Sequence, residues 1–352
     1  MTRMAVVYNA PAVRPIGQHA SALTPSPATG ATAPDPSETG VLDQVQAVCT
    51  MLSRAGFDAT AFEVHDVASL TSLLAERPDA VFNCCESLQG RAELEMCVAG
   101  FFEMAGLPYT GSRPLTLGMA LNKGLTKAVL RSHDVPTAPS CIVDSVAAVE
   151  AAAHLQFPVI VKPLAEDASI GIDEGSVVQT LDALRARVTF LLNELQAPVL
   201  VEEFVDGREF MVALLATAPG AWTVLPVEEV SFAGYPPEHP RILTYAAKWL
   251  PESLAYRTSA VSWPELPSDL TARLRHVAMA AASAMGLRDY GRVDVRVRDD
   301  GAVFVLEVNP NPDIGPESGF VATAKAGGLS YEDVIRTIAQ RALDRGSAAV
   351  RP

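Results

Sequence analysis

The chain has 352 residues, of which 49% are hydrophobic and 19% are charged, and its net charge at pH 7 is −14. This composition is ordinary for a globular protein long enough for two or three domains, while the negative charge argues against a nucleic-acid or anionic-membrane partner. No apolar run is long enough to cross a bilayer, and the five cysteines show neither metal spacing nor an even disulfide framework, which together predict a cytoplasmic protein with reduced thiols.

The first third of the chain alternates strands and helices. A segment rich in Pro, Thr and Ala, residues 21–40, interrupts the alternation, and we expect it to be a mobile loop. The pattern is typical of a small parallel α/β domain, which we assign to residues 1–112. The predicted elements are a strand at 4–9, a helix at 41–56, a strand at 80–85 and a helix at 92–106.

Two further units follow a pause in the pattern around residues 106–114. The second unit, residues 113–205, begins with a helix over 121–134 and contains apolar strands on both sides of a loop of small residues. The third unit comprises residues 206–352. Its predicted elements are an irregular stretch at 231–266, a helix at 269–285, a hairpin at 290–309 and a final helix at 331–344.

The stretch "YGRVDVRVRDDGAVFVLEVN", residues 290–309, predicts the hairpin. Asp300-Gly301 is a strong signal for a two-residue turn between alternating segments. With these two residues in the turn, Asp299 pairs with Ala302. Because side chains alternate between the faces of a strand, this register determines which polar residues share a face.

Counting back from that turn brings four polar side chains to one face. Asp294 lies opposite Glu307, and Arg292 lies opposite Asn309, at cross-strand distances of roughly 5 Å. Adjacent carboxylates repel each other unless a cation lies between them, and two carboxylates with an amide oxygen suit Mg²⁺. Arg292 would either neutralise the cluster or stabilise negative charge on a substrate. A solvated strand end is the alternative, and the shared face favours the metal site.

Lysine is rare in this chain, which has five lysines and 22 arginines. A lysine in such a chain either occurs by chance or lies where a compact charge with three hydrogen-bond donors is needed. Lys162 ends an apolar strand and precedes a loop with Ser169 and Gly171, which is suited to closing over a phosphate group. The alternative is an exposed lysine at a strand end, and a P-loop sequence is absent.

Acidic residues flank an apolar link in "VLVEEFVDGRE", residues 199–209. Glu202, Glu203 and Glu209 are unsuited to phosphate but suited to accepting hydrogen bonds from an adenine amino group or from ribose hydroxyls. Taken alone, the stretch favours a strand edge with solvated acids.

Five segments occur together in order: "GLPYTGS", "NKGLTKAVL", "FPVIVKP", "VLVEEFVDGREF" and "YGRVDVRV…LEVN". As a set they resemble the ATP-grasp superfamily and, within it, the D-alanine–D-alanine ligase group, over about residues 80–345. The resemblance implies an α/β (α+β) fold of three domains. Residues 1–112 would bind substrate, and ATP would lie between the central and the C-terminal domains.

The resemblance also implies a chemistry and a set of site residues. ATP would convert a carboxylate to an acyl phosphate, and an amine would then displace phosphate to form an amide. Two Mg²⁺ ions would accompany ATP, and Mn²⁺ would substitute for them. Residues 231–256 would form a lid that excludes water, and a homodimer is the family expectation. The implied residues are Lys123, Lys162 and Ser169 for the ATP phosphates, Glu202, Glu203 and Val205 for adenine, Glu209 for ribose, Lys248 for the γ-phosphate, Asp294, Glu307 and Asn309 for the metal ions, Arg292 for the tetrahedral intermediate, and Ser318 for the carboxylate of the second substrate.

The sequence departs from the group around the amino-acid substrates. After the first strand it reads "YNAPAVRP", where the group has a Gly-Gly turn and a Glu for the substrate ammonium. Ala168 replaces one of two serines, Trp249 replaces the tyrosine after the lid lysine, and Asp313 replaces a glycine. Loss of the linked Glu, Ser and Tyr predicts a changed first substrate.

We therefore expect a ligase for another amino acid or small carboxylate, with Glu38 or Glu86 as a candidate replacement acid. An authentic D-alanine–D-alanine ligase is the first alternative. A nucleotide-binding protein without turnover is the second, which the presence of Arg292 beside intact lysines and metal ligands disfavours. An ATP-grasp carboxylase is the third, but a biotin-carrier segment is missing from the sequence.

Overall fold

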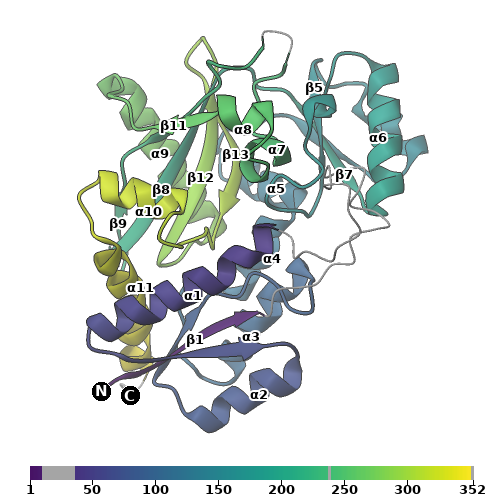
Figure 1. The fold of residues 1–352 in the computed structure, drawn as a ribbon. Helices are drawn as coiled ribbons and strands as arrows, with labels where there is room; N and C mark the ends of the chain where they lie inside the picture. The colour runs from purple at the N-terminus through teal and green to yellow at the C-terminus, as the bar shows by residue number, and fades with distance from the viewer. Residues whose placement is uncertain (10–35, 237–238, 350–352) are drawn as a thin grey trace.

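In the computed structural model of the protein, residues 1–9, 36–236 and 239–349 are described, and they form three β-sheets with helices packed against them (Figure 1). This mixed architecture confirms the predicted α/β class. Most of the loop expected at 21–40 lies outside the described residues, and from Pro36 on the segment is helical, which corrects the prediction there. Among the described residues, no helix has both the length and the apolar character needed to span a bilayer.

The N-terminal sheet has three parallel strands in the order β2-β1-β3. Met4 and Val6 of β1 pack toward α1, whereas Ala5 and Val7 pack toward α2 and α3, so β1 is buried on both faces. Strand β2 and helix α2 were not predicted, because β2 is an exposed edge strand with a weak apolar signal. The elements are β1 (Arg3–Asn9), α1 (Pro36–Arg54), β2 (Asp58–Val64), α2 (Val67–Glu76), β3 (Ala80–Asn83), a 3₁₀ helix (Ala92–Leu94) and α3 (Glu95–Met104).

The central sheet has four antiparallel strands in the order β4-β7-β5-β6, and α6 packs on one of its faces (Figure 1). The helix expected over 121–134 is present from Lys123 to Ser132, and another helix ends just before it at Leu121. Asn122 leaves the helical conformation and caps the second helix by accepting the N–H of Leu125 at 3.0 Å. The elements are α4 (Pro114–Leu121), α5 (Lys123–Ser132), β4 (Ser140–Val143), a 3₁₀ helix (Val146–Ala152), β5 (Val159–Pro163), a 3₁₀ helix (Glu174–Ser176), β6 (Val177–Val178), α6 (Leu181–Leu195) and β7 (Val199–Glu203).

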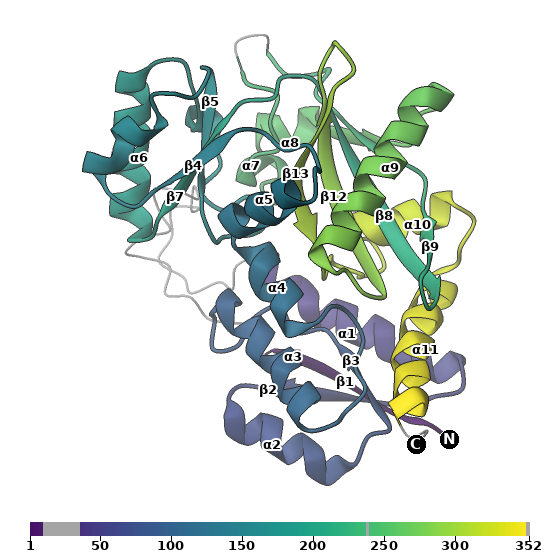
Figure 2. The same cartoon turned by 180° about the vertical axis from the view of Figure 1, so that it is seen from behind.

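The third sheet is antiparallel, with strand order β11-β10-β8-β12-β13 and β9 beside β8. Helix α9 covers one face, where valines of β12 and β13 pack against it (Figure 2). The stretch 231–266, expected to be irregular, contains two short helices and a strand. The elements are β8 (Arg208–Ala218), β9 (Ala221–Val224), β10 (Glu228–Ser231), α7 (Tyr245–Trp249), α8 (Leu254–Thr258), β11 (Ala260–Ser262), α9 (Ser268–Met285), β12 (Tyr290–Val297), β13 (Val303–Asn309), α10 (Gly319–Ala326) and α11 (Tyr331–Ala349).

The last helix, α11, packs against the N-terminal sheet. Val334 and Ile338 share a hydrophobic core with Phe82 of β3. Arg345 of the same helix donates to both carboxylate oxygens of Asp289, at 2.5 and 2.8 Å. The two ends of the described chain therefore share one core, although they are far apart in sequence.

The predicted hairpin forms, but its turn is longer than expected. The N–H of Arg298 donates to the carbonyl of Ala302 at 3.0 Å, so residues 299–301 make a three-residue turn with Gly301 at φ +82°. The two-residue turn predicted at Asp300 is therefore wrong, because glycine takes the left-handed position that ends a three-residue loop.

A β-bulge at Leu306 restores the predicted pairing nearer the pocket. Val295 pairs with Val305, but Asp294 pairs with Glu307, so Leu306 is an extra residue on β13. The bulge lets Leu306 and Glu307 line the same pocket although they are neighbours in sequence, whereas a regular strand would point them to opposite faces. The predicted pairing of Asp294 with Glu307 is confirmed, but it depends on a bulge that was not predicted.

Gly207, between β7 and β8, lies at φ +147°, and a Cβ there would be 2.1 Å from the carbonyl oxygen of Val297. We expect Gly207→Ala to lower the free energy of unfolding, measured with urea, by at least about 2 kcal/mol. Gly220→Ala is the control, because φ is +73° but no atom lies within 4 Å of the new Cβ, and it should cost about 1 kcal/mol. Equal losses would show that the close approach to Val297 does not matter.

Candidate active site

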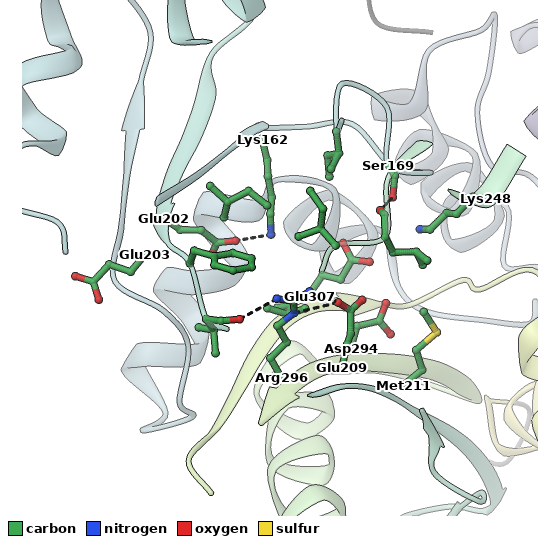
Figure 3. A pocket seen from close by; sticks show the side chains of 17 residues that line it. Lys162, Ser169, Glu202, Glu203, Glu209, Met211, Lys248, Asp294, Arg296 and Glu307 are labelled. Carbon is green, nitrogen blue, oxygen red and sulfur yellow. Dashed lines mark hydrogen bonds and ion pairs between the residues drawn. The ribbon is translucent and has the colours of Figure 1, made fainter. Parts of the chain in front are cut away.

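A pocket lies between the central sheet and the third sheet, and side chains from both line it (Figure 3). About 630 Å³ of space lies between its side chains, and this figure includes open solvent. Lys162 and Lys248 face Asp294 and Glu307 across it (Figure 3). Apolar side chains also line it, among them Ile160, Ile172, Phe204, Val205, Met211 and Leu306.

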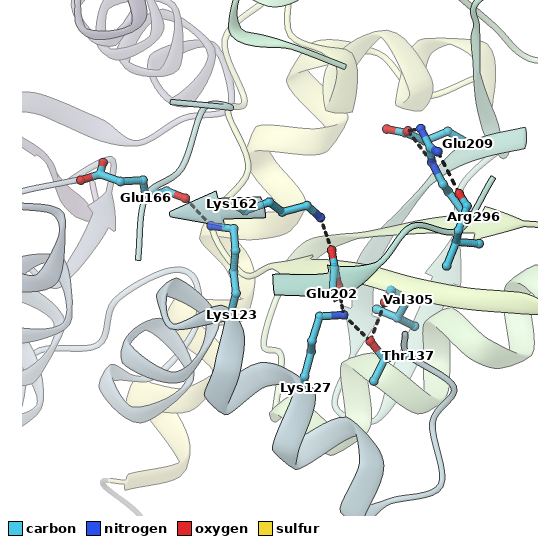
Figure 4. A network of polar contacts seen from close by, with 10 residues as sticks. Lys123, Lys127, Thr137, Lys162, Glu166, Glu202, Glu209, Arg296 and Val305 are labelled. Carbon is cyan, nitrogen blue, oxygen red and sulfur yellow. Dashed lines mark hydrogen bonds and ion pairs between the residues drawn. The ribbon is translucent and has the colours of Figure 1, made fainter. Parts of the chain in front are cut away.

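Glu202 of β7 is buried between two lysines (Figure 4). Lys127 Nζ lies 2.5 Å from Oε2, and Lys162 Nζ contacts Oε1. Burial opposes ionisation of Glu202, but the two ammonium groups outweigh it and lower its pKa to about 2. The side chain that was predicted to accept a hydrogen bond from adenine therefore has the two lysines as its partners.

Lys123 and Lys127 share one face of α5, because they are four residues apart. Lys123 is buried, and its Nζ donates to the carbonyl oxygen of Glu166 in the loop after β5 (Figure 4). Lys127 was not predicted as a site residue. It donates to Thr137 at 2.7 Å and holds the Glu202 carboxylate, and the spacing of two rare lysines is the sequence signal that identifies it.

The loop after β5 contacts the segment that carries the lid lysine. Ser169 donates its hydroxyl to the carbonyl of Leu243 at 2.9 Å, and Trp249 Nε1 donates to the carbonyl of Ala168 at 3.0 Å. Ala168 and Ser169 have φ of +55° and +61°, a conformation that costs non-glycine residues energy and persists only where neighbours impose it. Lys248, beside Trp249 on α7, lines the pocket. The loop after β5 and the segment around Lys248 thus contact each other beside the pocket.

The link between β7 and β8 orients its acids in different directions. Glu203 points away from the pocket (Figure 3), and its Oε1 accepts the N–H of Gln156 at 2.9 Å. Glu209 Oε2 accepts two hydrogen bonds from Arg296, at 3.0 and 2.7 Å. The carbonyl of Val205, a pocket residue, also accepts from Arg296, at 2.9 Å. Both acids of this link therefore have partners within the protein.

Arg296 was not predicted as a site residue. Its guanidinium is buried and lies over the rings of Phe204 and Phe232, 5.0 and 6.0 Å from their centroids. It shares the pocket face with Asp294, two residues earlier on β12, and that spacing is the sequence signal. Arg296 fixes the position of the Glu209 carboxylate and of the link behind it.

Asp294, Glu307 and Asn309 come together as predicted. The Asn309 amide donates to Asp294 and to Glu307, both at 3.3 Å, and Arg292 pairs with Asn309 across the hairpin. Within the described part of the chain, no group of three or more His, Cys, Asp or Glu side chains is placed to hold a metal ion. A metal ion here would therefore depend on two carboxylates, the oxygen of a rotated Asn309 amide and substrate oxygens.

The two carboxyl groups have opposite pKa shifts. Burial raises the pKa of Asp294 to about 6, and Glu307 adds to this although Arg292 opposes it. Burial also acts on Glu307, but the cations Lys248 and Lys123 outweigh it and lower its pKa to about 2. A hydrogen bond between the two side chains raises the pKa of Asp294 and lowers that of Glu307. Mg²⁺ suits these hard oxygen donors, so the residues fit the ion.

Arg292 and Ser318 each form hydrogen bonds with residues close to them in the sequence. Arg292 donates to both carboxylate oxygens of Asp294, at 2.7 and 2.8 Å. Ser318 precedes α10 and caps it, because its Oγ accepts the N–H of Val321 at 3.3 Å. Helix capping alone therefore accounts for a serine at this position.

The family model described as D-ala D-ala ligase C-terminus matches residues 128–340. The chain belongs to the D-alanine–D-alanine ligase family. It is 34% identical to a D-alanine–D-alanine ligase of Pseudomonas fluorescens over 305 residues, 85% of each chain, and 36% identical to the uncharacterized protein y4sG of Sinorhizobium fredii over 265 residues, 75% of each chain. The fold matches a crystal structure of a D-alanine–D-alanine ligase from Bacillus anthracis with a TM-score of 0.75, at 21% identity, covering 99% of this chain and 100% of that chain.

Membership of the D-alanine–D-alanine ligase family makes the protein an ATP-grasp carboxylate–amine ligase. The sequence differences that we expect around the amino-acid substrates include Asp313. Asp313, in the place of a glycine, accepts the N–H of Gly315 at 2.6 Å, and burial raises its pKa. The N–H of Glu86 donates to Asn9 at 2.9 Å, while the side chain of Glu38 lies outside the described residues.

Proposed function

We propose that this protein joins a carboxylic acid to an amine through an acyl phosphate, with release of ADP and phosphate. The observation that carries the proposal is the convergence of cations and acids on one pocket. Lys162 and Lys248 face it on one side, and Asp294 and Glu307 face it on the other (Figure 3). Phosphate groups need cations around them, and the metal ions that accompany them need oxygen ligands.

Each site residue has a role in this proposal. Glu202 has the further task of orienting the two lysines that it contacts, and the backbone of Glu203 is used instead of its side chain, which points away. The proposed roles are Lys123, Lys162 and Ser169 for the ATP phosphates, Glu202, Glu203 and Val205 around adenine, Glu209 for ribose, Lys248 for the γ-phosphate, Arg292 for the tetrahedral intermediate and Ser318 for the second substrate.

The reaction has two steps. A carboxylate oxygen of the first substrate attacks the γ-phosphorus of ATP, and the bond to ADP breaks. The amine nitrogen then attacks the carbonyl carbon of the acyl phosphate, and phosphate leaves. Negative charge develops near Lys248 and Arg292, whose positions are set before the reaction begins. Asp294, Glu307 and Asn309 would hold two Mg²⁺ ions, for which Mn²⁺ would substitute, and these ions would neutralise charge on phosphate oxygens.

Exclusion of water protects the acyl phosphate, which hydrolyses readily. The contacts of Ser169 with Leu243 and of Trp249 with Ala168 connect the covering loop to the lid. We propose residues 231–256 as that lid. In the proposed division, residues 1–112 bind substrate, and ATP lies between domains 113–205 and 206–352. A cytoplasmic homodimer is part of the same proposal.

The proposed first substrate is an acid other than D-alanine. Trp249 donates to the carbonyl of Ala168, so two positions that differ from the family contact each other. The identity of 34% to a D-alanine–D-alanine ligase supports the alternative, authentic D-alanine–D-alanine ligase activity. A nucleotide-binding protein without turnover is disfavoured, because binding alone does not require Arg292 in the site.

The test is release of ADP from Mg·ATP with a panel of D- and L-amino acids and small carboxylates, singly and in pairs with amines. We expect turnover that needs one specific acid and a second substrate. Rapid turnover with D-alanine alone would establish the alternative and contradict the changed pocket. ATP binding by calorimetry without turnover on any pair would favour the protein that only binds nucleotide.

A further inference from the structure

Glu228 is a buried acid that the proposed mechanism does not use. It begins β10 and is 3% exposed. Glu228 pairs with Met211, Met211 with Asp294, and Asp294 with Glu307, so the four residues form one row across four strands. Directly paired residues project to the same face of a sheet. Glu228 therefore points to the face that carries the candidate active site.

A directed chain of hydrogen bonds holds the Glu228 carboxylate. Trp263 Nε1 donates to Thr323 Oγ1 at 3.0 Å, and Thr323 donates its own proton to Glu228 Oε2 at 2.8 Å. Burial outweighs the Thr323 hydroxyl and the charge of Arg292, so the pKa of Glu228 is raised above its usual value. The hydroxyl and the guanidinium are the contacts that stabilise the ionised form.

The carboxylate lies against the first turn of α10. A Cβ on Gly319 would be 3.7 Å from either carboxylate oxygen of Glu228, and Ser318 immediately before it caps the helix. A helix N-terminus favours a negative charge. At α10 this charge is supplied by Glu228, at the position where the family resemblance expects the carboxylate of the second substrate beside Ser318.

Arg292, the nearest cation, is already balanced by acids of the protein. It is paired with Asp294 through two hydrogen bonds, at 2.7 and 2.8 Å, and Glu307 and Glu228 also lie within its electrostatic reach. It acts in addition on Asp313. The positive charge that would receive a substrate carboxylate therefore has several carboxylates around it.

We propose that Glu228 takes the place of a substrate carboxylate, so that the second substrate is an amine without an α-carboxylate. This inference rests on the proposed function and specifies its amine. A carboxylate on the acceptor would lie near Glu228 and Asp313, and like charges in a partly buried site repel strongly. An amine that ends in hydrogen, hydroxyl or a second ammonium group avoids this repulsion. Its nitrogen attacks the acyl carbon, phosphate leaves with the electrons of the broken bond, and the proton is released to solvent.

A purely structural role for Glu228 makes a different prediction. If the residue only ties α10 to β10 through Thr323, its replacement changes stability and lowers turnover with every acceptor alike. If it replaces a substrate carboxylate, its replacement changes the ratio of turnover between acceptors. That ratio is measured on one preparation, so it does not depend on the fraction of folded protein.

The experiment first identifies the acid without reference to the natural amine. Hydroxylamine traps an acyl phosphate as a hydroxamate, so acids are screened with Mg·ATP and hydroxylamine. The acid that reacts is then offered matched acceptors that differ only in a carboxyl group: alanine with ethylamine, serine with ethanolamine, and lysine with cadaverine, the amino acids in both configurations. We expect kcat/KM to be at least tenfold higher for the amines, whose charge does not oppose that of Glu228.

The matched variants are Glu228→Gln and Glu229→Gln. Glutamine at 228 retains the size of the side chain and the contact with Thr323, and it should raise the ratio of amino acid to amine turnover about tenfold or more. Glu229 is the next residue on β10, pairs with Arg208 at 2.7 Å and projects to the other face, so its variant should leave the ratio unchanged.

Each outcome decides the inference. Preference for amines that Glu228→Gln reverses or weakens supports it. Wild-type preference for the amino acids, or a ratio unchanged in Glu228→Gln, overturns it while hydroxamate formation leaves the proposed function in place. Absence of hydroxamate with every acid would overturn the proposed function, and this inference with it.

Discussion

Glu307→Gln is expected to lower kcat/KM for ADP release by about 10²–10³-fold, the usual loss when one group that stabilises developing charge is removed. Glu307 lies on the pocket face beside Asp294, and despite burial the nearby Lys248 and Lys123 hold its pKa at about 2. It is therefore ionised throughout the range in which the enzyme would be assayed. Glutamine keeps the shape of the side chain and removes the charge that Mg²⁺ requires.

The measurement combines initial rates with a binding experiment. Rates of ADP release give kcat/KM, and calorimetric titration with Mg·ATP reports binding without turnover. Asp300→Asn is the control, since Asp300 is exposed at the far end of the same hairpin and pairs with Arg298 at 2.5 Å. Wild-type rates and unchanged Mg·ATP binding in Glu307→Gln would exclude this carboxylate as a metal ligand.

Glu202→Gln is expected to lower the free energy of unfolding by about 3–5 kcal/mol, the usual loss when one partner of a buried ion pair is removed. The variant leaves Lys127 and Lys162 side by side in a buried site without a counter-charge. Urea denaturation at pH 7 measures the loss. Glu203→Gln is the control, because the neighbouring carboxylate points away from the lysines and accepts only the N–H of Gln156 among its described contacts.

The stability that Glu202 contributes should also depend on pH. Burial alone would raise its pKa, but the two lysines lower it from 4.5 to about 2. The ionised form therefore favours the folded state, so the contribution is complete above pH 4.5 and is lost as the pH falls toward 2. This gap corresponds to about 3 kcal/mol. The difference in unfolding free energy between wild type and Glu202→Gln should shrink across that window, and a constant difference would show that the ion pair contributes little.

Local sequence was sufficient where a single element decides the arrangement. Alternation along β12 places Arg292 and Asp294 on one face, because period two is a property of the strand itself. Helical spacing likewise brings Lys123 and Lys127 together on α5. Alternation, with the hairpin register, predicted the metal-type cluster from the residues alone, whereas Lys123 was implied by the family resemblance and Lys127 was not predicted.

Only the tertiary structure explains why Asp294 pairs with Glu307. The predicted turn was one residue too short, and the bulge at Leu306 compensates for it. A bulge is set by the strand that pairs with it and by the pocket that it lines, so local alternation does not reveal it. The predicted pair is therefore correct, whereas the turn from which it was counted is wrong.

The sequence by itself indicated the family, many of the elements and the polar residues that share a strand or helix face. Only the tertiary structure decided which charges are already paired. Lys162 reaches Glu202 across 40 residues, and Thr323 reaches Glu228 across 95. A carboxylate accepts hydrogen bonds either from a ligand or from other groups of the protein, depending on which side chains pack beside it. In both of these cases the neighbouring side chain comes from a distant part of the chain.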